Sequence, residues 1–334
     1  MATIYEVSKL AGVSLATVSR VMNNNANVSD ATREKVTRAM TELGYRPNSI
    51  AQSLASNCSN SVGLLVSELQ GPFYGPMMSG IETAFRKQDK HVIIAAGHSN
   101  QEREQQAIEF LISRNCDGLI LHVEAISDDY LIELSKGKTP FVLINRYIRE
   151  LASRCIILNN VKGGYLATKH VLEQGHTNIA YISGPLWKQD AQDRLAGHKQ
   201  ALAEHNISFN EQLLYQGDFM EDSGTAGFQH LYNGNSKFTA LICANDEMAT
   251  GAMASARESS LILPEQLSIM GYDNVFFTRH VYPPLSTVNY PINEMGQMAA
   301  NWILSEVYKK TTPALQTLFE PELVVRQSII TNPQ

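Results

Sequence analysis

The chain has 334 residues, of which 44% are hydrophobic and 18% are charged, so it is globular rather than disordered or fibrous and long enough for two or three domains. Its net charge of −6 is unevenly spread, because residues 1–60 carry six cations and four acids whereas the remainder carries 21 cations and 29 acids. A slightly basic head on an acidic body fits a protein whose first part contacts DNA. An excess of two charges also arises by chance, so this asymmetry decides nothing alone.

The four cysteines, Cys58, Cys116, Cys155 and Cys243, are far apart and form no CxxC motif, which indicates a reducing compartment and small core side chains. The nine histidines show no metal-ligand spacing, so we expect no metal site. The first residues lack the basic start and apolar stretch of a signal peptide, and no apolar run approaches the ~20 residues that span a bilayer. We expect a soluble, cytoplasmic protein with no membrane partner and no cofactor.

Residues 1–47 predict a headpiece of three short helices. Thr3–Ile4–Tyr5–Glu6 forms a capping box that opens a first helix, whose apolar side consists of Ile4, Val7, Leu10 and Ala11. Gly12 allows the sharp turn that follows, and Ser14 is a favourable N-cap for the second helix. Ser29–Asp30 opens a third helix, whose apolar stripe consists of Val36, Ala39, Met40 and Leu43.

The second helix has two different sides. Val18, Val21 and Met22 share one face, which can pack on the first helix. The outward residues are small, partly polar and include one cation: Leu15, Ala16, Thr17, Ser19 and Arg20. Such a surface suits a DNA major groove better than a protein core, so the pattern predicts a helix-turn-helix. Two helices joined by a glycine also occur in cores, and the headpiece context strengthens the prediction.

Residues 48–60 are a candidate hinge and linker. One short helix can form over 48–56, and the segment from Ser56 to Ser61 has the small, polar composition of a linker. A helix this short is marginal alone in water. On physical grounds two interpretations stay open: a hinge that orders on DNA with Leu54 as a minor-groove wedge, or a frayed linker whose Leu54 packs on the body.

From Ser61 onward, short apolar runs alternate with helical patterns. Such runs are typical of parallel strands buried on both faces. A first series of strands is predicted at 62–66, 91–96, 118–122 and 140–144, and a second at 179–183, 213–215, 240–243 and 267–271. Helices are expected between them at 77–88, 102–114, 128–136, 163–174, 194–206, 223–232 and 247–259.

Two such series imply two doubly wound α/β subdomains with right-handed crossovers. Near Tyr290–Ile292 the chain is expected to cross back, so that 293–308 forms the last helix of the first subdomain and 323–326 a final strand of the second. We therefore assign 61–159 with 290–318 to the N-terminal subdomain, and 160–289 with 319–330 to the C-terminal one. Ligands of open parallel sheets bind at the carboxyl ends of the strands, so the expected site is the cleft between the subdomains.

No glycine pattern reads as a phosphate or dinucleotide loop, and no nucleophile motif is present. The polar and aromatic residues that follow strand ends are Ser67, Phe73, Tyr74, Asn145, Arg146, Asp190, Asp193, Arg194, Asp218, Phe219, Asn245, Asp246, Tyr272 and Asp273. Amide, carboxylate and guanidinium groups bind hydroxyls in pairs while a ring covers a C–H face, so this mixture suits a sugar.

Structural interpretations compete at several of these positions. Asp193 and Asp246 directly precede predicted helices, which favours N-caps over ligands. Phe73 and Phe219, taken singly, are typical of core aromatics. Arg194 would open a helix against the helix dipole, a mild cost that favours a specific role.

The chain also resembles the lactose/galactose repressor family of bacterial transcription regulators. In the first part the similar segments are 3–7, 11–14, 17–21 and 44–48, and in the body they are 184–185, 194–197, 244–249 and 271–274. Segments 143–146, 190–194 and 290–292 are similar to the galactose branch. The resemblance implies an α/β fold with an N-terminal all-α helix-turn-helix headpiece and two doubly wound, periplasmic-binding-protein-like subdomains.

The resemblance also implies site residues. Leu15, Ala16 and Arg20 would read base edges; Tyr5, Ser14, Thr17, Asn23 and Asn48 would contact phosphates; and segment 51–55, which includes Ala51 and Leu54, favours the hinge with its wedge. Many relatives have Arg where Gln52 stands. Arg194, Asn245 and Asp273 would hold effector hydroxyls, with Ser67, Phe73, Asn145 and Phe219 completing the pocket. Asn159 and Asn160 are left out, because the family often has acidic residues there.

These observations predict a repressor that binds a pseudo-palindromic double-stranded DNA operator and is released by a small sugar, galactose or a galactoside. No heptads follow Val325, so a homodimer is expected rather than a coiled-coil tetramer, and two-fold symmetry doubles the short site that one helix reads. A purine-type regulator, whose ligand strengthens DNA binding, stays open. A transporter's solute-binding protein would carry a signal peptide instead of the helix-turn-helix, and an enzyme would need a marked acid/base pair.

Overall fold

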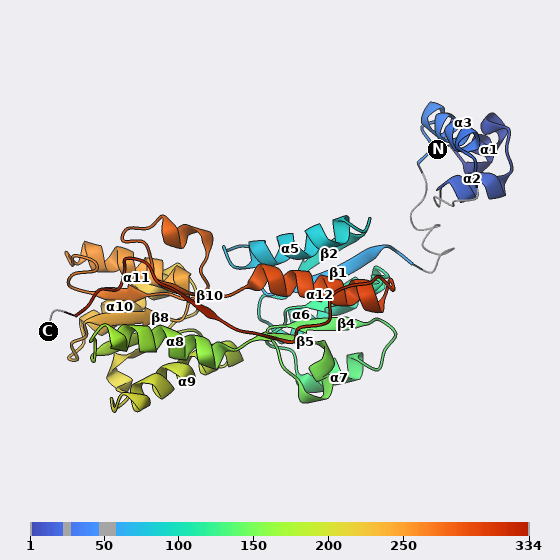
Figure 1. Ribbon diagram of the computed structural model, residues 1–334. Helices are drawn as coiled ribbons and strands as arrows, with labels where there is room; N and C mark the ends of the chain where they lie inside the picture. The colour runs from blue at the N-terminus through green and yellow to red at the C-terminus, as the bar shows by residue number, and fades with distance from the viewer. Residues whose placement is uncertain (1, 23–27, 47–57, 333–334) are drawn as a thin grey trace. The chain divides into compact units, whose positions relative to one another are not determined.

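The computed structural model describes residues 2–22, 28–46 and 58–332. The chain divides into two compact units, Met1–Asn60 and Ser61–Gln334 (Figure 1). Four residues predicted to contact DNA, namely Asn23, Asn48, Ala51 and Leu54, lie outside the described ranges.

The first unit contains the predicted helices as α1 (Ile4–Ala11), α2 (Leu15–Met22) and α3 (Asp30–Glu42). The capping box is confirmed: the Thr3 amide donates to Glu6 Oε2 over 2.7 Å, and the Glu6 amide donates to Thr3 Oγ1. The glycine turn is also confirmed, because Gly12 has a φ of 64° that L side chains rarely adopt. Ser14 caps α2 by accepting from the Thr17 amide over 3.2 Å.

The headpiece core is small. It consists of Val7, Val18, Val21, Val36 and Ala39. The predicted placement of Leu10 on the apolar side of α1 is wrong, because its side chain is 46% exposed. Leu10 borders a surface hollow beside Glu34 and Lys35 of α3, so it is only partly covered.

In the second unit, a six-stranded parallel sheet forms what we call the first lobe. The strand order is β11-β5-β4-β3-β1-β2, with bounds Ser61–Val66 for β1, His91–Ala96 for β2, Gly118–Leu121 for β3, Phe141–Ile144 for β4, Cys155–Leu158 for β5 and Leu318–Phe319 for β11. Helices α5 (Tyr74–Arg86) and α12 (Ile292–Glu306) pack on one face. Helices α6 (Gln101–Ser113) and α7 (Asp128–Leu134) pack on the other.

The second lobe has a four-stranded parallel sheet of order β7-β6-β8-β9. Its strands are β6 (Ile179–Ser183), β7 (Leu214–Gln216), β8 (Ala240–Cys243) and β9 (Ser268–Met270). Helices α8 (Asn160–Glu173) and α9 (Gln189–Glu204) pack together, as do α10 (Glu221–Tyr232) and α11 (Asp246–Glu258), and Figure 1 shows the two pairs on opposite faces of the sheet. The predicted fold class is therefore confirmed.

Short elements complete the body. Strands β10 (Thr287–Asn289) and β12 (Glu322–Val324) pair antiparallel, and the 3₁₀ helices are Arg149–Arg154, Glu211–Leu213 and Phe276–Arg279. The chain passes from one lobe to the other between β5 and α8, between β10 and α12, and between β11 and β12.

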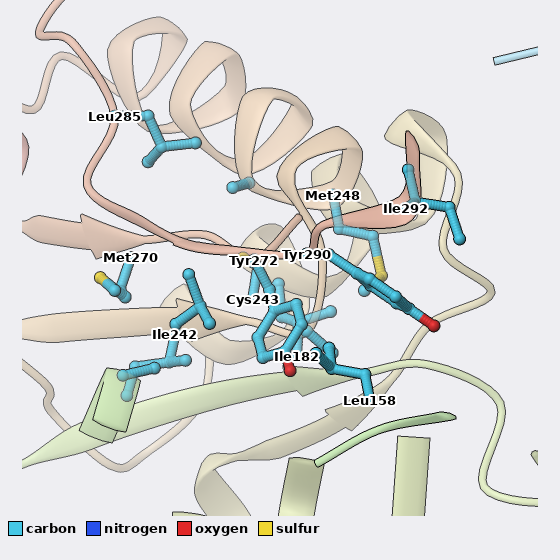
Figure 2. Close-up of a cluster of buried hydrophobic side chains, with 14 of the residues drawn as sticks. Leu158, Ile182, Ile242, Cys243, Met248, Met270, Tyr272, Leu285, Tyr290 and Ile292 are labelled. Carbon is cyan, nitrogen blue, oxygen red and sulfur yellow. The ribbon is translucent and has the colours of Figure 1, made fainter. Parts of the chain in front are cut away.

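One buried apolar cluster continues from each lobe into the crossing segments. Figure 2 shows part of it, in which Leu158 of β5, Met248 of α11 and Tyr290 of a crossing segment lie among second-lobe side chains. The lobes therefore share packed residues where the chain crosses between them. Among the helices within the described ranges, none has the length and apolar character needed to cross a membrane.

Candidate functional site

A cavity of about 540 Å³ lies between the two lobes. Residues that follow the carboxyl ends of β1, β2, β3 and β4 line it from the first lobe, and residues that follow β6, β7, β8 and β9 line it from the second. This is the end of parallel strands at which ligands bind in open α/β sheets.

Six of the seven residues predicted to contact the effector line this cavity: Phe73, Asn145, Arg194, Phe219, Asn245 and Asp273. Ser67 does not. It is buried, and its hydroxyl lies 3.1 Å from Nδ1 of His122, which lines the cavity in its place. The sequence thus brings six of the chosen side chains to one place, while their contact with an effector stays a prediction.

Arg194 is a buried charge at the centre of the second-lobe wall. Its Nε donates to Asn160 Oδ1 over 3.0 Å, its Nη1 lies 3.4 Å from Asp273 Oδ1, and its guanidinium lies 3.9 Å from the centre of the Tyr272 ring. Burial lowers the pKa of Arg194, but the Asp273 carboxyl and its neighbours raise the pKa by more than burial lowers it. The guanidinium therefore stays charged. Burial in turn raises the pKa of Asp273, and Arg194 opposes that shift.

Two glycines hold the helix of Arg194 against its neighbour. A Cβ on Gly197 of α9 would lie 2.0 Å from the Val161 carbonyl oxygen, and a Cβ on Gly164 of α8 would lie 2.0 Å from the Arg194 carbonyl oxygen. The backbones of α8 and α9 therefore touch, which fixes the depth at which Arg194 enters the lobe. The predicted position of Arg194 at a helix start is wrong, because α9 begins at Gln189.

Asn160, which is excluded from the predicted site, holds Arg194 in place by a hydrogen bond. Its Oδ1 accepts from Arg194 Nε and, over 3.2 Å, from the Tyr272 hydroxyl. The side chain is buried, so no solvent can replace those bonds. The one sequence signal that could have found it is its place directly after β5, a strand that the apolar pattern did not identify.

The two proposed N-caps are wrong. Asn245 caps α11, since its Oδ1 accepts from the Met248 amide over 3.0 Å while its Nδ2 donates to the Phe219 carbonyl over 2.8 Å. Asp246 is fully buried and accepts from the Val275 amide and the Thr287 hydroxyl; burial raises its pKa to about 7. Asp193 lies inside α9. In both cases the helix starts earlier in the chain than the apolar pattern indicates.

Polar contacts join the lobes along the cavity wall. Lys188 of the second lobe pairs with Glu124 of the first over 2.7 Å, and both side chains are nearly buried. Asn145 donates to Asp190 over 3.4 Å and accepts from the Tyr290 hydroxyl over 2.7 Å. The pair of Lys188 with Glu124 has no sequence signal, because its partners are 64 residues apart and meet only in the fold.

The Glu124 loop is itself held in place. The buried carboxylate of Glu104 on α6 accepts from the backbone amides of Glu124, Ala125 and Ile126 at 2.8–3.2 Å. The carboxylate of Glu124 is thereby fixed at the cavity edge.

The cavity carries more acids than bases. The carboxylates that line it are Glu68, Glu124, Asp190, Asp218, Glu247 and Asp273, whereas the lysine and arginine side chains are Lys188 and Arg194. Both cations are paired with carboxylates. Among the described residues no group of histidine, cysteine or acidic side chains is arranged to hold a metal ion.

In the headpiece, the outward side of α2 is accessible. Ala16 and Arg20 are exposed, and Leu15 and Thr17 are partly exposed. Tyr5 is 70% exposed on α1. The Ser14 and Thr17 hydroxyls lie 2.9 Å apart at the start of α2, where backbone N–H groups favour an anion such as phosphate.

Comparisons with known proteins identify the family. Residues 3–48 match the model of the bacterial regulatory proteins, lacI family, and residues 168–329 match that of the periplasmic binding protein-like domain. The HTH-type transcriptional regulator GalR of Escherichia coli (strain K12) is 40% identical over 331 residues, which cover 99% of this chain and 96% of that protein. This chain belongs to the lacI family. It is a DNA-binding transcriptional repressor of that family.

Two solved structures are similar over nearly the whole chain of this lacI-family repressor. The lac repressor dimer bound to operator and the anti-inducer ONPF is 30% identical with a TM-score of 0.87, and covers 98% of this chain and 99% of that one. The complex of transcriptional regulator CelR with cellobiose is 31% identical with a TM-score of 0.71, and covers 98% and 100%.

The Asn160 contacts predict a stability difference between two variants of the repressor. Asn160→Leu leaves Arg194 Nε and the Tyr272 hydroxyl without their acceptor, so the free energy of unfolding of the 61–334 unit should fall by about 1–3 kcal/mol. Asn160→Asp keeps an oxygen in the same place, so its free energy of unfolding should fall by less than about 1 kcal/mol. Urea unfolding followed by circular dichroism measures both, and equal losses in the two variants would contradict this role.

Proposed function

We propose that this repressor is a homodimer that binds a pseudo-palindromic operator and is released from it by a neutral sugar, D-galactose or a galactoside, bound between the lobes. The observation that carries the proposal is the composition of the cavity. Carboxylates, three amides and a guanidinium surround it together with two phenylalanine rings. A sugar offers the matching surface, since its hydroxyls donate and accept while its C–H face packs on a ring.

The charge balance favours a neutral ligand. Lys188 and Arg194 are already paired with carboxylates, so neither is free to bind an anionic ligand. A phosphate or carboxylate group that enters the cavity would instead meet further acids, such as Asp218 and Glu247. Placing like charges together costs several kcal/mol. The cellobiose complex of a 31% identical regulator supports a sugar as the ligand class.

Release would follow from the position of the cavity. A sugar that contacts both lobes stabilises the arrangement of the lobes to which it binds best. DNA affinity then falls by the ratio of the sugar's affinities for the two arrangements. On the DNA side, Leu15, Ala16 and Arg20 would read base edges, while Tyr5, Ser14 and Thr17 would contact phosphates. Asn23, Asn48, Ala51 and the Leu54 wedge would complete this surface.

The cavity charge predicts selectivity between two ligands of the same ring. D-Galactose should bind the full-length repressor in isothermal titration calorimetry, and D-galactose 6-phosphate should bind at least about tenfold more weakly. Methyl β-D-galactoside serves as a neutral control of similar size. Tighter binding of the phosphate would contradict a neutral ligand, and binding of hypoxanthine but of no sugar would replace the sugar with a purine-type effector.

The surface supports a second copy of the chain as the partner. Strand β2 lies at an open edge of the first-lobe sheet, and Ile94 on it is 42% exposed. The second lobe exposes Phe276 and Tyr282 even more. Large apolar side chains at a sheet edge favour association, and the 30% identical lac repressor is a dimer in its operator complex.

A matched pair of variants tests the dimer. Ile94→Glu should raise the dimer dissociation constant by about tenfold or more, because it buries a charge in an apolar interface. Phe110→Glu alters a side chain that is also 42% exposed but lies on α6, and it should leave the constant unchanged. Sedimentation velocity over a concentration series measures both. A monomeric wild-type protein, or equal weakening by the two variants, would contradict this interface.

A further inference from the structure

His122 has a buried ring nitrogen without a hydrogen-bond partner in the part of the chain that the structure describes. The residue directly follows β3, lines the cavity between the lobes and is 2% exposed. Its Nδ1 lies 3.1 Å from the Ser67 hydroxyl, whereas its Nε2 has no hydrogen-bond partner among the described residues. A buried polar atom without a partner costs about 1–3 kcal/mol, so such an atom at a cavity calls for an explanation.

The described side chains around the His122 imidazole supply no partner for Nε2, which leaves the cavity as its source. The Phe73 and Tyr74 rings stand edge-on to the imidazole at 6.5 and 5.5 Å between centres. The apolar rings therefore flank His122, and its Nδ1 is occupied by the Ser67 hydroxyl. The groups left to complete Nε2 are a ligand or a water molecule in the cavity that His122 lines.

The imidazole is held neutral. Burial lowers the pKa of His122, and the nearby charges of Glu124, Lys188 and Asp190 partly offset one another. In a neutral imidazole one nitrogen donates and the other accepts. The Ser67 hydroxyl can take either role, so its bond to Nδ1 sets which role is left for Nε2.

We propose that Nε2 of His122 binds one hydroxyl of the sugar directly, and that Ser67 acts through His122 by fixing the orientation and tautomer of the ring. This inference rests on the proposed function and goes further by naming the residue that distinguishes sugars. A sugar that lacks this hydroxyl leaves Nε2 unpaired, and a site built around a buried polar atom rejects such an analogue.

Two variants of His122 distinguish the role of Nδ1 from the role of Nε2. His122→Asn keeps an amide near the Nδ1 position that can still bond Ser67 but leaves the cavity end empty. His122→Gln extends its amide towards the Nε2 position. In titration calorimetry with D-galactose, the full-length Asn variant should bind about tenfold or more weakly than wild type, and the Gln variant within about threefold of it. Thermal unfolding followed by circular dichroism confirms that both variants are folded.

Deoxy sugars identify the hydroxyl. Among the 2-, 3-, 4- and 6-deoxy derivatives of D-galactose, one should lose about tenfold affinity for wild type and little further affinity for His122→Asn, because the same bond is removed twice. Equal losses in both proteins for every derivative would overturn the direct contact. So would wild-type affinity of the Asn variant, or a loss in the Gln variant as large as in the Asn variant.

The Ser67 role has a readout that needs no sugar. Nitrogen-15 spectra of the histidine rings in the free protein should show His122 as one neutral tautomer, and Ser67→Ala should change the ratio of tautomers. An unchanged ratio would overturn the part assigned to Ser67. If wild type binds no D-galactose, the galactose effector fails by itself, while the spectra still decide the Ser67–His122 link.

Discussion

The buried charge of Arg194 is the constraint on which the second lobe depends. Burying a guanidinium costs free energy unless its N–H groups find acceptors and its charge is paired with an opposite charge. The partners come from separate parts of the chain: Asn160 starts α8, while Tyr272 and Asp273 follow β9. Each of these segments has to reach its final place before Arg194 is satisfied. The cavity wall is therefore built by the same contacts that hold the lobe together.

A second consequence is that some residues that line the cavity also join the two lobes. At the cavity, Asn145 contacts Asp190 and Glu124 contacts Lys188. A ligand that competes for or bridges these groups changes what joins the lobes as well as filling the space between them. This is the physical requirement for a ligand to shift a two-state equilibrium, since it needs contacts that differ between the states.

Much of the fold was predictable because its signals are local. The capping box at Thr3, the turn at Gly12 and the buried apolar runs each depend on a few adjacent residues. Strands β5, β10 and β11 were not predicted, although they are no shorter as a group than β7 and β9, which were; β10 and β11 pair at their edges of the fold with only one neighbouring strand each. The N-caps at Asp193 and Asp246 failed because helix starts are set by backbone geometry beyond the apolar stripe.

The site was predictable to the extent that strand ends mark it. Six residues chosen from strand ends and family motifs do line the cavity. Asn160, Lys188 and His122 were not found, because their importance lies in partners far away in sequence: Arg194, Glu124 and Ser67. A side chain's partners are a property of tertiary structure, and one sequence does not display them.

Coupling between the cavity and the headpiece can be measured as the affinity of the full-length repressor for a fluorescent palindromic operator, selected from a library, with and without D-galactose. Fluorescence anisotropy at one fixed salt concentration is required, because phosphate contacts make DNA affinity steeply salt-dependent. We expect sequence-selective binding that galactose weakens. Selective binding that neither galactose nor another neutral sugar weakens would contradict the proposed coupling between the cavity and the headpiece.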